Sequence, residues 1–215
     1  MNVLHGKIAS WAVAATSTMI FFGVVALAPL ISAAPIEQKI IALLMTAIST
    51  LGLYKIIYMA IFFIFGKWRW LRKILLGDSF LEGTWVGHWV YEDKHVYTIE
   101  EISQETGETT ISGRQIGEDL KTQADWSSES VYIDLRRKRL TYVYSCDVYR
   151  TNHQQNGIGV FKLVKSSNKL PPNILDGYTV DMIDGDKDPN TEHKISDEII
   201  DTEKALAKAR EIFNV

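Results

Sequence analysis

The apolar residues of this chain gather in two long runs near its beginning, and most of the remainder alternates between apolar and polar positions. The first run, 8–34, holds no charged residue, and the second, 40–66, holds only Lys55. Each run exceeds the roughly 20 residues that span a bilayer as a helix. We therefore predict two transmembrane helices, at about 8–34 and 40–66, joined by a tight turn that begins at Pro35.

The end of the first run has a second interpretation. The small residues at 31–34 fit a signal-peptidase site. The run is longer than the apolar core of a signal peptide, however, and another apolar run follows at once. The pattern therefore favours a helical hairpin over a cleaved signal.

Basic residues flank this hairpin on its outer sides. Lys7 precedes the first run, and Lys67, Arg69, Arg72 and Lys73 follow the second, whereas the turn holds one Lys and one Glu. Flanking Lys and Arg residues stay on the cytoplasmic side of a membrane. We therefore expect the N and C termini to be cytoplasmic.

The second run also carries polar residues. A lysine at mid-membrane costs about 2.5–3.5 kcal/mol on insertion scales, so Lys55 either snorkels or pairs locally, or lines an interface or wet path in an oligomer. Thr46, Ser49 and Thr50 recur at helical spacing. Small or hydroxyl residues at this spacing allow membrane helices to pack closely. These four residues are candidates for contact within the hairpin or between copies of the chain.

From about residue 77 onward, short alternating segments are separated by turn residues. We predict about eight strands, at 81–91, 95–102, 109–116, 120–126, 130–137, 140–149, 157–164 and 175–183. Even, short strands with no helix between them predict a compact antiparallel β-barrel over 77–185. The chain thus divides into a membrane part, 1–76, the barrel, and a final part, 186–215.

The final part is predicted to be a solvated connector followed by an amphipathic helix. Ser196 can cap the start of that helix. Ile199, Leu206, Ala209 and Phe213 then form one apolar stripe. Such a stripe needs a partner surface, which is either the barrel or another copy.

Candidate binding residues lie on the predicted strands and combine flat rings, cations and hydroxyls. They are Trp85, Trp89, Tyr142 and Tyr144 for stacking, Arg114, Arg150 and Lys162 for anionic groups, and Thr110 and Ser112 for hydrogen bonds. This mixture suits a cavity that stacks on rings and neutralises an anion. Alternatively, the indoles pack in the core and the cations lie on the solvated outer face. The alternation of residues along each strand does not decide between these two placements.

The sequence offers no catalytic or metal-binding pattern. Cys146 is the only cysteine and sits among Tyr and Val, and the five histidines have no ligand-like spacing. The run 184–190 departs from a calcium loop, because a proline stands where glycine is required. The net charge of -3 argues against a nucleic-acid scaffold. We expect a protein that is not an enzyme and uses no metal or cofactor.

The order of these parts resembles a known family. Two membrane helices, a basic WRWLRK segment and LEGTWVGHWVY opening a compact barrel are similar to the two-transmembrane β-barrel effectors of cyclic-oligonucleotide-based antiphage signalling. The resemblance covers the chain to about Asp184. It implies a bacterial inner-membrane protein whose barrel binds a cyclic dinucleotide made by a cognate nucleotidyltransferase. It further implies that the liganded protein forms homo-oligomers, disrupts the membrane and kills the infected cell.

Two other functions remain open at this stage. A membrane-tethered, lipocalin-like barrel would bind a fatty acid or lipid, and would need a lumen lined mainly by aliphatic side chains. A constitutive membrane scaffold would have a filled barrel and no ligand. None of the three readings calls for a DNA or RNA partner.

Overall fold

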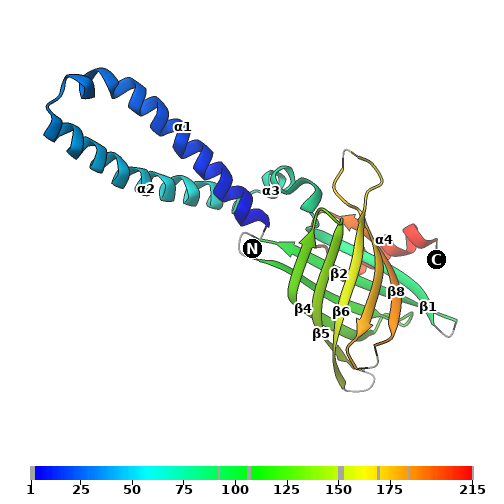
Figure 1. Cartoon of the computed structure of the whole chain (residues 1–215). Coiled ribbons are helices and arrows are strands. Elements are labelled where there is room, and N and C mark those ends of the chain that lie inside the picture. The colour runs from blue at the N-terminus through cyan, green and yellow to red at the C-terminus, as the bar shows by residue number, and fades with distance from the viewer. Residues whose placement is uncertain are drawn as a thin grey trace. The chain divides into compact units, whose positions relative to one another are not determined.

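The computed structural model describes residues 3–91, 93–105, 108–149, 153–168, 170–183 and 185–214 (Figure 1). The chain forms two compact units that divide between Leu76 and Gly77. The first unit is helical. The second is a barrel with one helix after it, so the predicted fold class is confirmed.

The helical unit contains α1 (Val3–Ala33), α2 (Ile36–Lys67) and α3 (Arg69–Leu76). Both α1 and α2 are long and apolar enough to cross a membrane. Pro35 precedes α2 with a φ of -58°, which suits the first turn of a helix. The predicted hairpin helices are therefore present, and each begins a few residues earlier than expected.

Basic side chains cap the ends of two of these helices. Arg72 Nη1 donates to the carbonyls of Phe65 (3.2 Å) and Gly66 (2.7 Å) in the last turn of α2, and Lys7 Nζ donates to the carbonyl of Leu75 (2.6 Å) in α3. The last carbonyls of a helix lack partners within it, and cations there also complement the helix dipole. The basic segment after the second apolar run is thus a separate helix fastened to α2.

The four residues of α2 proposed for contacts in the membrane are hydrogen-bonded within their own helix or exposed. The hydroxyls of Thr46 and Thr50 each donate to the carbonyl four residues earlier, at 2.7 Å. Ser49 and Lys55 are exposed. Within the hairpin these hydroxyls need no other partner, so a contact between copies stays a prediction.

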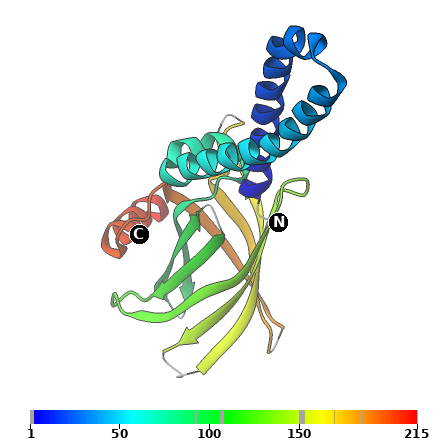
Figure 2. The same cartoon turned by 90° about the vertical axis from the view of Figure 1, so that its left-hand side faces the viewer.

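Eight antiparallel strands form the closed barrel (Figure 2). Each strand pairs with the next, and β1 pairs with β8 to close the sheet. The strands are β1 (Gly83–Tyr91), β2 (Lys94–Gln104), β3 (Thr109–Ile116), β4 (Thr122–Asp134), β5 (Arg139–Val148), β6 (His153–Val164), β7 (Ile174–Asp181) and β8 (Lys187–Ser196).

Two strand predictions were wrong in ways that offset each other. The segments predicted at 120–126 and 130–137 are one strand, β4, with a bulge between Ser128 and Ser130 where the serine-rich sequence suggests a turn. The segment predicted as a connector contains β8, which has little apolar alternation because its inward side chains are polar. The barrel therefore extends to Ser196 and does not end at 185.

The C-terminal helix α4 (Thr202–Phe213) packs on the outer wall of the barrel. Asp201, not Ser196, is its N-cap, and accepts from the Lys204 backbone N–H at 3.0 Å. The buried residues of α4, including Leu206 and Ala209, meet a patch formed by Val86, Tyr97, Ile99 and Ile116. The partner of the predicted stripe is thus the barrel. Ile199, which was assigned to the stripe, precedes the helix and is 50% exposed.

Candidate functional site

The barrel has two unlike ends. At the closed end, where β1 starts and β2 stops, most inward side chains are buried; those at most 1% exposed include Leu81, Ile102, Ile111, Leu140, Phe161 and Leu175. At the open end the inward positions are half-buried; they include Trp89, Gln115, Tyr144, Cys146, Gln155, Thr179 and Asp181. The inward side chains at the open end are therefore partly accessible to solvent, whereas those at the closed end are packed.

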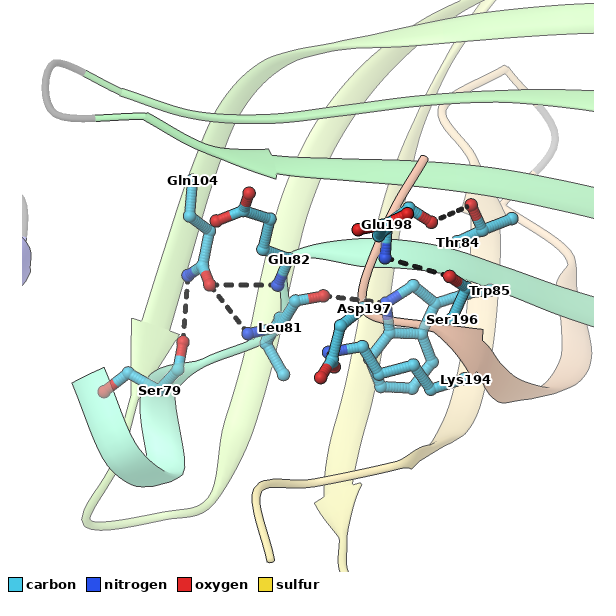
Figure 3. Close-up of polar contacts among 10 residues, drawn as sticks. All are labelled: Ser79, Leu81, Glu82, Thr84, Trp85, Gln104, Lys194, Ser196, Asp197 and Glu198. Atoms are coloured by element: carbon cyan, nitrogen blue, oxygen red, sulfur yellow. Dashed lines mark hydrogen bonds and ion pairs between the residues drawn. The ribbon is translucent and has the colours of Figure 1, made fainter. Parts of the chain in front are cut away.

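A single side chain, Gln104, fixes the chain segment that enters the closed end (Figure 3). Its Oε1 accepts from the backbone N–H groups of Leu81 (2.7 Å) and Glu82 (3.0 Å), and its Nε2 donates to the carbonyl of Ser79 (2.9 Å). All three bonds are buried, where an unmade backbone hydrogen bond is costly. The first residues after α3 are thereby locked into the barrel.

Trp85 and Lys194 complete the closed end. The Trp85 indole is 0% exposed, and its N–H donates to the carbonyl of Leu81 at 2.8 Å. Lys194 Nζ lies 2.8 Å from Asp197 Oδ1 and 5.7 Å from the Trp85 ring centroid (Figure 3). It also lies 4.4 Å from the ring centroid of Phe80. A cation held over two rings and beside a carboxylate is well stabilised although it is largely buried.

Two carboxyl groups meet deeper in the lumen. Glu100 is 1% exposed and Glu192 is 0% exposed. Glu100 Oε1 accepts from the Tyr142 hydroxyl (2.7 Å) and from Trp126 Nε1 (3.0 Å), and Glu192 Oε1 accepts from Asn190 Nδ2 (2.9 Å). The other oxygen of each carboxyl, Oε2, has no hydrogen-bond donor among the described residues. We refer to Glu100 and Glu192 as the acid pair.

The surroundings of the acid pair favour its protonated form. Burial, followed by the charge of Glu100, raises the pKa of Glu192 well above its ordinary value. Burial also raises the pKa of Glu100, although hydrogen bonds from Glu192, Tyr142 and Trp126 lower it in part. A proton placed between the two carboxyls satisfies an oxygen on each. The pair therefore keeps a proton at pH values where a free glutamic acid has lost it.

Glycines on the barrel wall make room for the aromatic rings. A Cβ atom added at Gly113 would lie 2.4 Å from the Trp126 indole, and one at Gly159 would lie 2.6 Å from the Tyr142 ring. Gly157 faces Tyr144 in the same way, at 2.4 Å. Each ring thus lies directly against the glycine of the neighbouring strand. This packing aims the Tyr142 hydroxyl and the Trp126 N–H at Glu100.

Replacing Gly159 with alanine should displace Tyr142 and destabilise the barrel by about 1–3 kcal/mol, because the new methyl overlaps a buried ring. Gly117→Ala is the matched control, since its Cβ would mainly meet the mobile end of the Gln123 side chain. Urea unfolding followed by near-ultraviolet circular dichroism measures both. Equal stability of the two variants would contradict the packing role of Gly159.

The single thiol does not have the properties of a nucleophile. Burial, followed by Asp125, Asp147 and Asp181, raises the pKa of Cys146 to about 11. The thiol is therefore protonated at neutral pH, and a thiol is far less reactive than a thiolate. Cys146 is only half-buried in the barrel, and its raised pKa agrees with the absence of a catalytic pattern around it in the sequence.

The predicted binding residues divide between the two faces of the barrel. Trp85, Trp89, Tyr142 and Tyr144 face the lumen, Thr110, Ser112, Arg114 and Lys162 face outward, and Arg150 lies outside the described residues. The placement of these cations and hydroxyls in a cavity with the rings was wrong. In β3 the inward phase belongs to Gly113, which pairs with Glu100, so its neighbours at 112 and 114 point away. Trp85 is also committed to the core and offers no free face.

Two of the outward residues do lie together. Ser112 and Arg114 line a polar groove of about 430 Å³ on the outer wall with Asp125, Asp147 and Tyr149 among others. Arg114 also reaches Glu101 (3.5 Å) and the Thr202 hydroxyl (3.2 Å). With two carboxylates against one guanidinium among its described residues, this groove does not favour an anion.

The sequence did not reveal the acid pair or its donors. Glu100 is followed by Glu101, and neighbouring residues of a strand face opposite sides of the sheet. The sequence therefore does not tell which of the two glutamates faces inward. Glu192 and Asn190 lie in β8, which was not predicted as a strand. The alternation of β1 could have identified Glu100 as inward-facing. Trp85 faces inward, and Glu100 is its partner on β2, so Glu100 lies on the same face of the sheet.

Comparisons with known proteins add no assignment. No protein-family model matches the chain, and neither does any curated protein or solved structure.

Proposed function

We propose that this chain is a membrane-anchored receptor whose barrel takes up a small ligand at its open end. The observation that carries the proposal is the contrast between the two ends of the lumen: one is packed, and the other is lined by half-buried rings and polar groups. Small barrels that hold a ligand have this form. The packed end is the end that the chain enters after α3.

A cyclic dinucleotide is the ligand class that we propose. Trp89 and Tyr144 offer ring faces for bases, and Asp181 and Asn190 offer oxygens to the N–H groups on base edges. The phosphates would remain at the rim, where the exposed Lys94 begins β2 on the inward phase. This arrangement replaces the phosphate contacts first expected from Arg114 and Lys162.

The two other ligand classes fit less well. The aliphatic part of the lumen is filled by its own side chains, so it leaves no room for a fatty-acid tail. A scaffold without a ligand would gain stability from filling both ends, whereas here the open end holds half-buried polar side chains.

The proposed output is assembly in the membrane. A ligand shifts a protein toward the state that it binds more tightly, so the occupied barrel must favour contact between copies. Lys55 and the hydroxyls of Thr46, Ser49 and Thr50 would then be brought together from several hairpins and open a polar defect. In this proposal the protein resides in the bacterial inner membrane with both termini in the cytoplasm, and it does no catalysis itself.

Calorimetry on the full-length protein in lipid nanodiscs, with a panel of cyclic dinucleotides and a fatty acid, tests the ligand. Trp89→Ala should weaken binding of the best ligand by about 1–3 kcal/mol if a base stacks there. Tyr132→Ala is the control, because Tyr132 lies on the outer wall and is 66% exposed. Absence of binding by every cyclic dinucleotide, or equal loss in both variants, would overturn the proposal.

A further inference from the structure

Four consecutive basic residues, 136–139, lie in the turn between β4 and β5 and at the start of β5, at the closed end of the barrel. Asp134 Oδ1 fixes this turn by accepting from the backbone N–H groups of Arg136 (2.9 Å) and Arg137 (3.1 Å). The four side chains are exposed. Among the described residues, only Arg137 has an acidic partner, at 3.9 Å. We call residues 135–139 the basic tip.

The basic tip is tied to the place where the chain enters the barrel. The carbonyl of Lys138 accepts from the backbone N–H of Leu163 at 2.8 Å. Two residues further on, Lys165 pairs with Asp78. Asp78 is the second residue after α3, so a short series of contacts joins the tip to the start of the barrel unit. Only nine residues, 68–76, separate this unit from the end of α2.

Apolar side chains are exposed at the same end. Leu135, in the tip itself, is 39% exposed, and Leu170, in the loop between β6 and β7, is 55% exposed. Figure 2 shows this loop and the β4–β5 turn projecting from the same end of the barrel. Exposed apolar residues beside basic ones are typical of segments that insert shallowly at a lipid surface.

The open end of the barrel has no comparable run of basic residues among its described residues. The described residues of its turns and of the adjoining strand ends include five acidic side chains and three basic ones, namely Asp93, Glu118, Asp119, Asp186 and Asp188 against Lys94, Lys121 and Lys187. The basic tip is therefore the densest group of positive charge among the described turn residues, although Glu105 and Glu108 of the β2–β3 turn lie at the same end. The charge distribution selects the same end of the barrel as the chain connectivity does.

We propose that the basic tip, together with Leu170, docks onto the anionic headgroups of the bilayer in which the helices are anchored. The basic side chains bind the headgroups, and Leu135 and Leu170 enter the headgroup layer. Docking would fix the barrel with its closed end at the membrane and its open end toward the water, where a ligand arrives. Each basic residue near an anionic surface favours the docked state about fivefold.

Spin labels on the full-length protein in nanodiscs test this directly. The label is placed at Leu135→Cys or, as the control at the open end, at Asp119→Cys, each in a Cys146→Ser background. In nanodiscs of phosphatidylcholine with phosphatidylglycerol, the label at 135 should be reached by lipid-soluble oxygen and protected from a water-soluble nickel complex. The label at 119 should be reached by the nickel complex. Replacing residues 136–139 with glutamine, or removing phosphatidylglycerol, should reduce the docked-to-free ratio about fivefold per charge lost or more.

Equal nickel accessibility at 135 and 119 in anionic nanodiscs would overturn the proposal, as would protection at 135 that is unchanged by the glutamine variant. Circular dichroism of each variant establishes that its barrel is folded. Ligand binding plays no part in this measurement, so its outcome is independent of the proposed receptor function.

Discussion

Replacing Trp85 with alanine is expected to destabilise the barrel by about 3–5 kcal/mol, the usual cost of removing a fully buried indole. Trp85 is 0% exposed and belongs to the closed-end cluster that contains Leu81, Leu140 and Phe161. The variant also loses the hydrogen bond from the indole N–H to the carbonyl of Leu81, which leaves a buried acceptor without that donor. Because whole barrels are stable by only about 5–15 kcal/mol, a loss of this size should be obvious in urea unfolding.

Trp89→Ala is the matched control, because it removes the same side chain from the same face of the same strand. Trp89 is half-buried at the open end, so its loss should cost only about 1–2 kcal/mol. If the two variants were equally stable, the distinction between a packed end and an open end would be wrong. The comparison therefore tests the observation on which the receptor proposal depends.

The sequence predicts the fold well wherever one face of an element is apolar. The two long apolar runs have one structural solution each, and strands such as β5 alternate because one face packs in the core. β8 fails this test. Its inward side chains, among them Asn190 and Glu192, face other polar groups, so a strand buried in the barrel has the composition of a loop.

The candidate site was only half predictable for the same reason. The inward aromatic residues follow from the phase of β1, where glycines and indoles share one face, and of β5, where Leu140 and two tyrosines share one face. The phase of β3 does not follow, because Ser112 and Arg114 alternate with Gly113 and Gln115 and neither set is apolar. Register with β2 decides it, and register is a tertiary property. The acid pair requires two strands, β2 and β8, that lie on either side of β1 and far apart in sequence.

Replacing Glu192 with glutamine is expected to stabilise the protein at neutral pH and to remove much of its loss of stability with rising pH. Burial raises the pKa of both Glu100 and Glu192 in the folded state, and the charge of Glu100 raises that of Glu192 further. Above the ordinary glutamic acid pKa of 4.5, the unfolded chain releases protons that the folded pair retains. Stability therefore falls by about 1.4 kcal/mol per pH unit for each retained proton, until the raised pKa is reached.

Glutamine imitates the protonated acid without this dependence. Its amide oxygen can accept from Asn190 as Glu192 does, and its N–H can donate to Glu100. Below the pKa of the unfolded glutamic acid the two proteins should be about equally stable, since both then hold a neutral group at 192. The difference should grow as the pH rises toward neutral, and urea unfolding at several pH values measures it.

Asp188→Asn provides the control for charge alone. Asp188 also lies on β8, but it is exposed at the open end, so its neutralisation should leave the slope of stability against pH almost unchanged. A Glu192→Gln slope equal to that of the wild type would mean that Glu192 is ionised in the folded barrel. The buried Oε2 atoms would then carry charge without a hydrogen-bond donor among the described residues. This would destabilise the fold by far more than the hydrogen bonds from Asn190, Tyr142 and Trp126 stabilise it. A shared proton is therefore the arrangement that lets two carboxyls lie in the middle of a packed barrel.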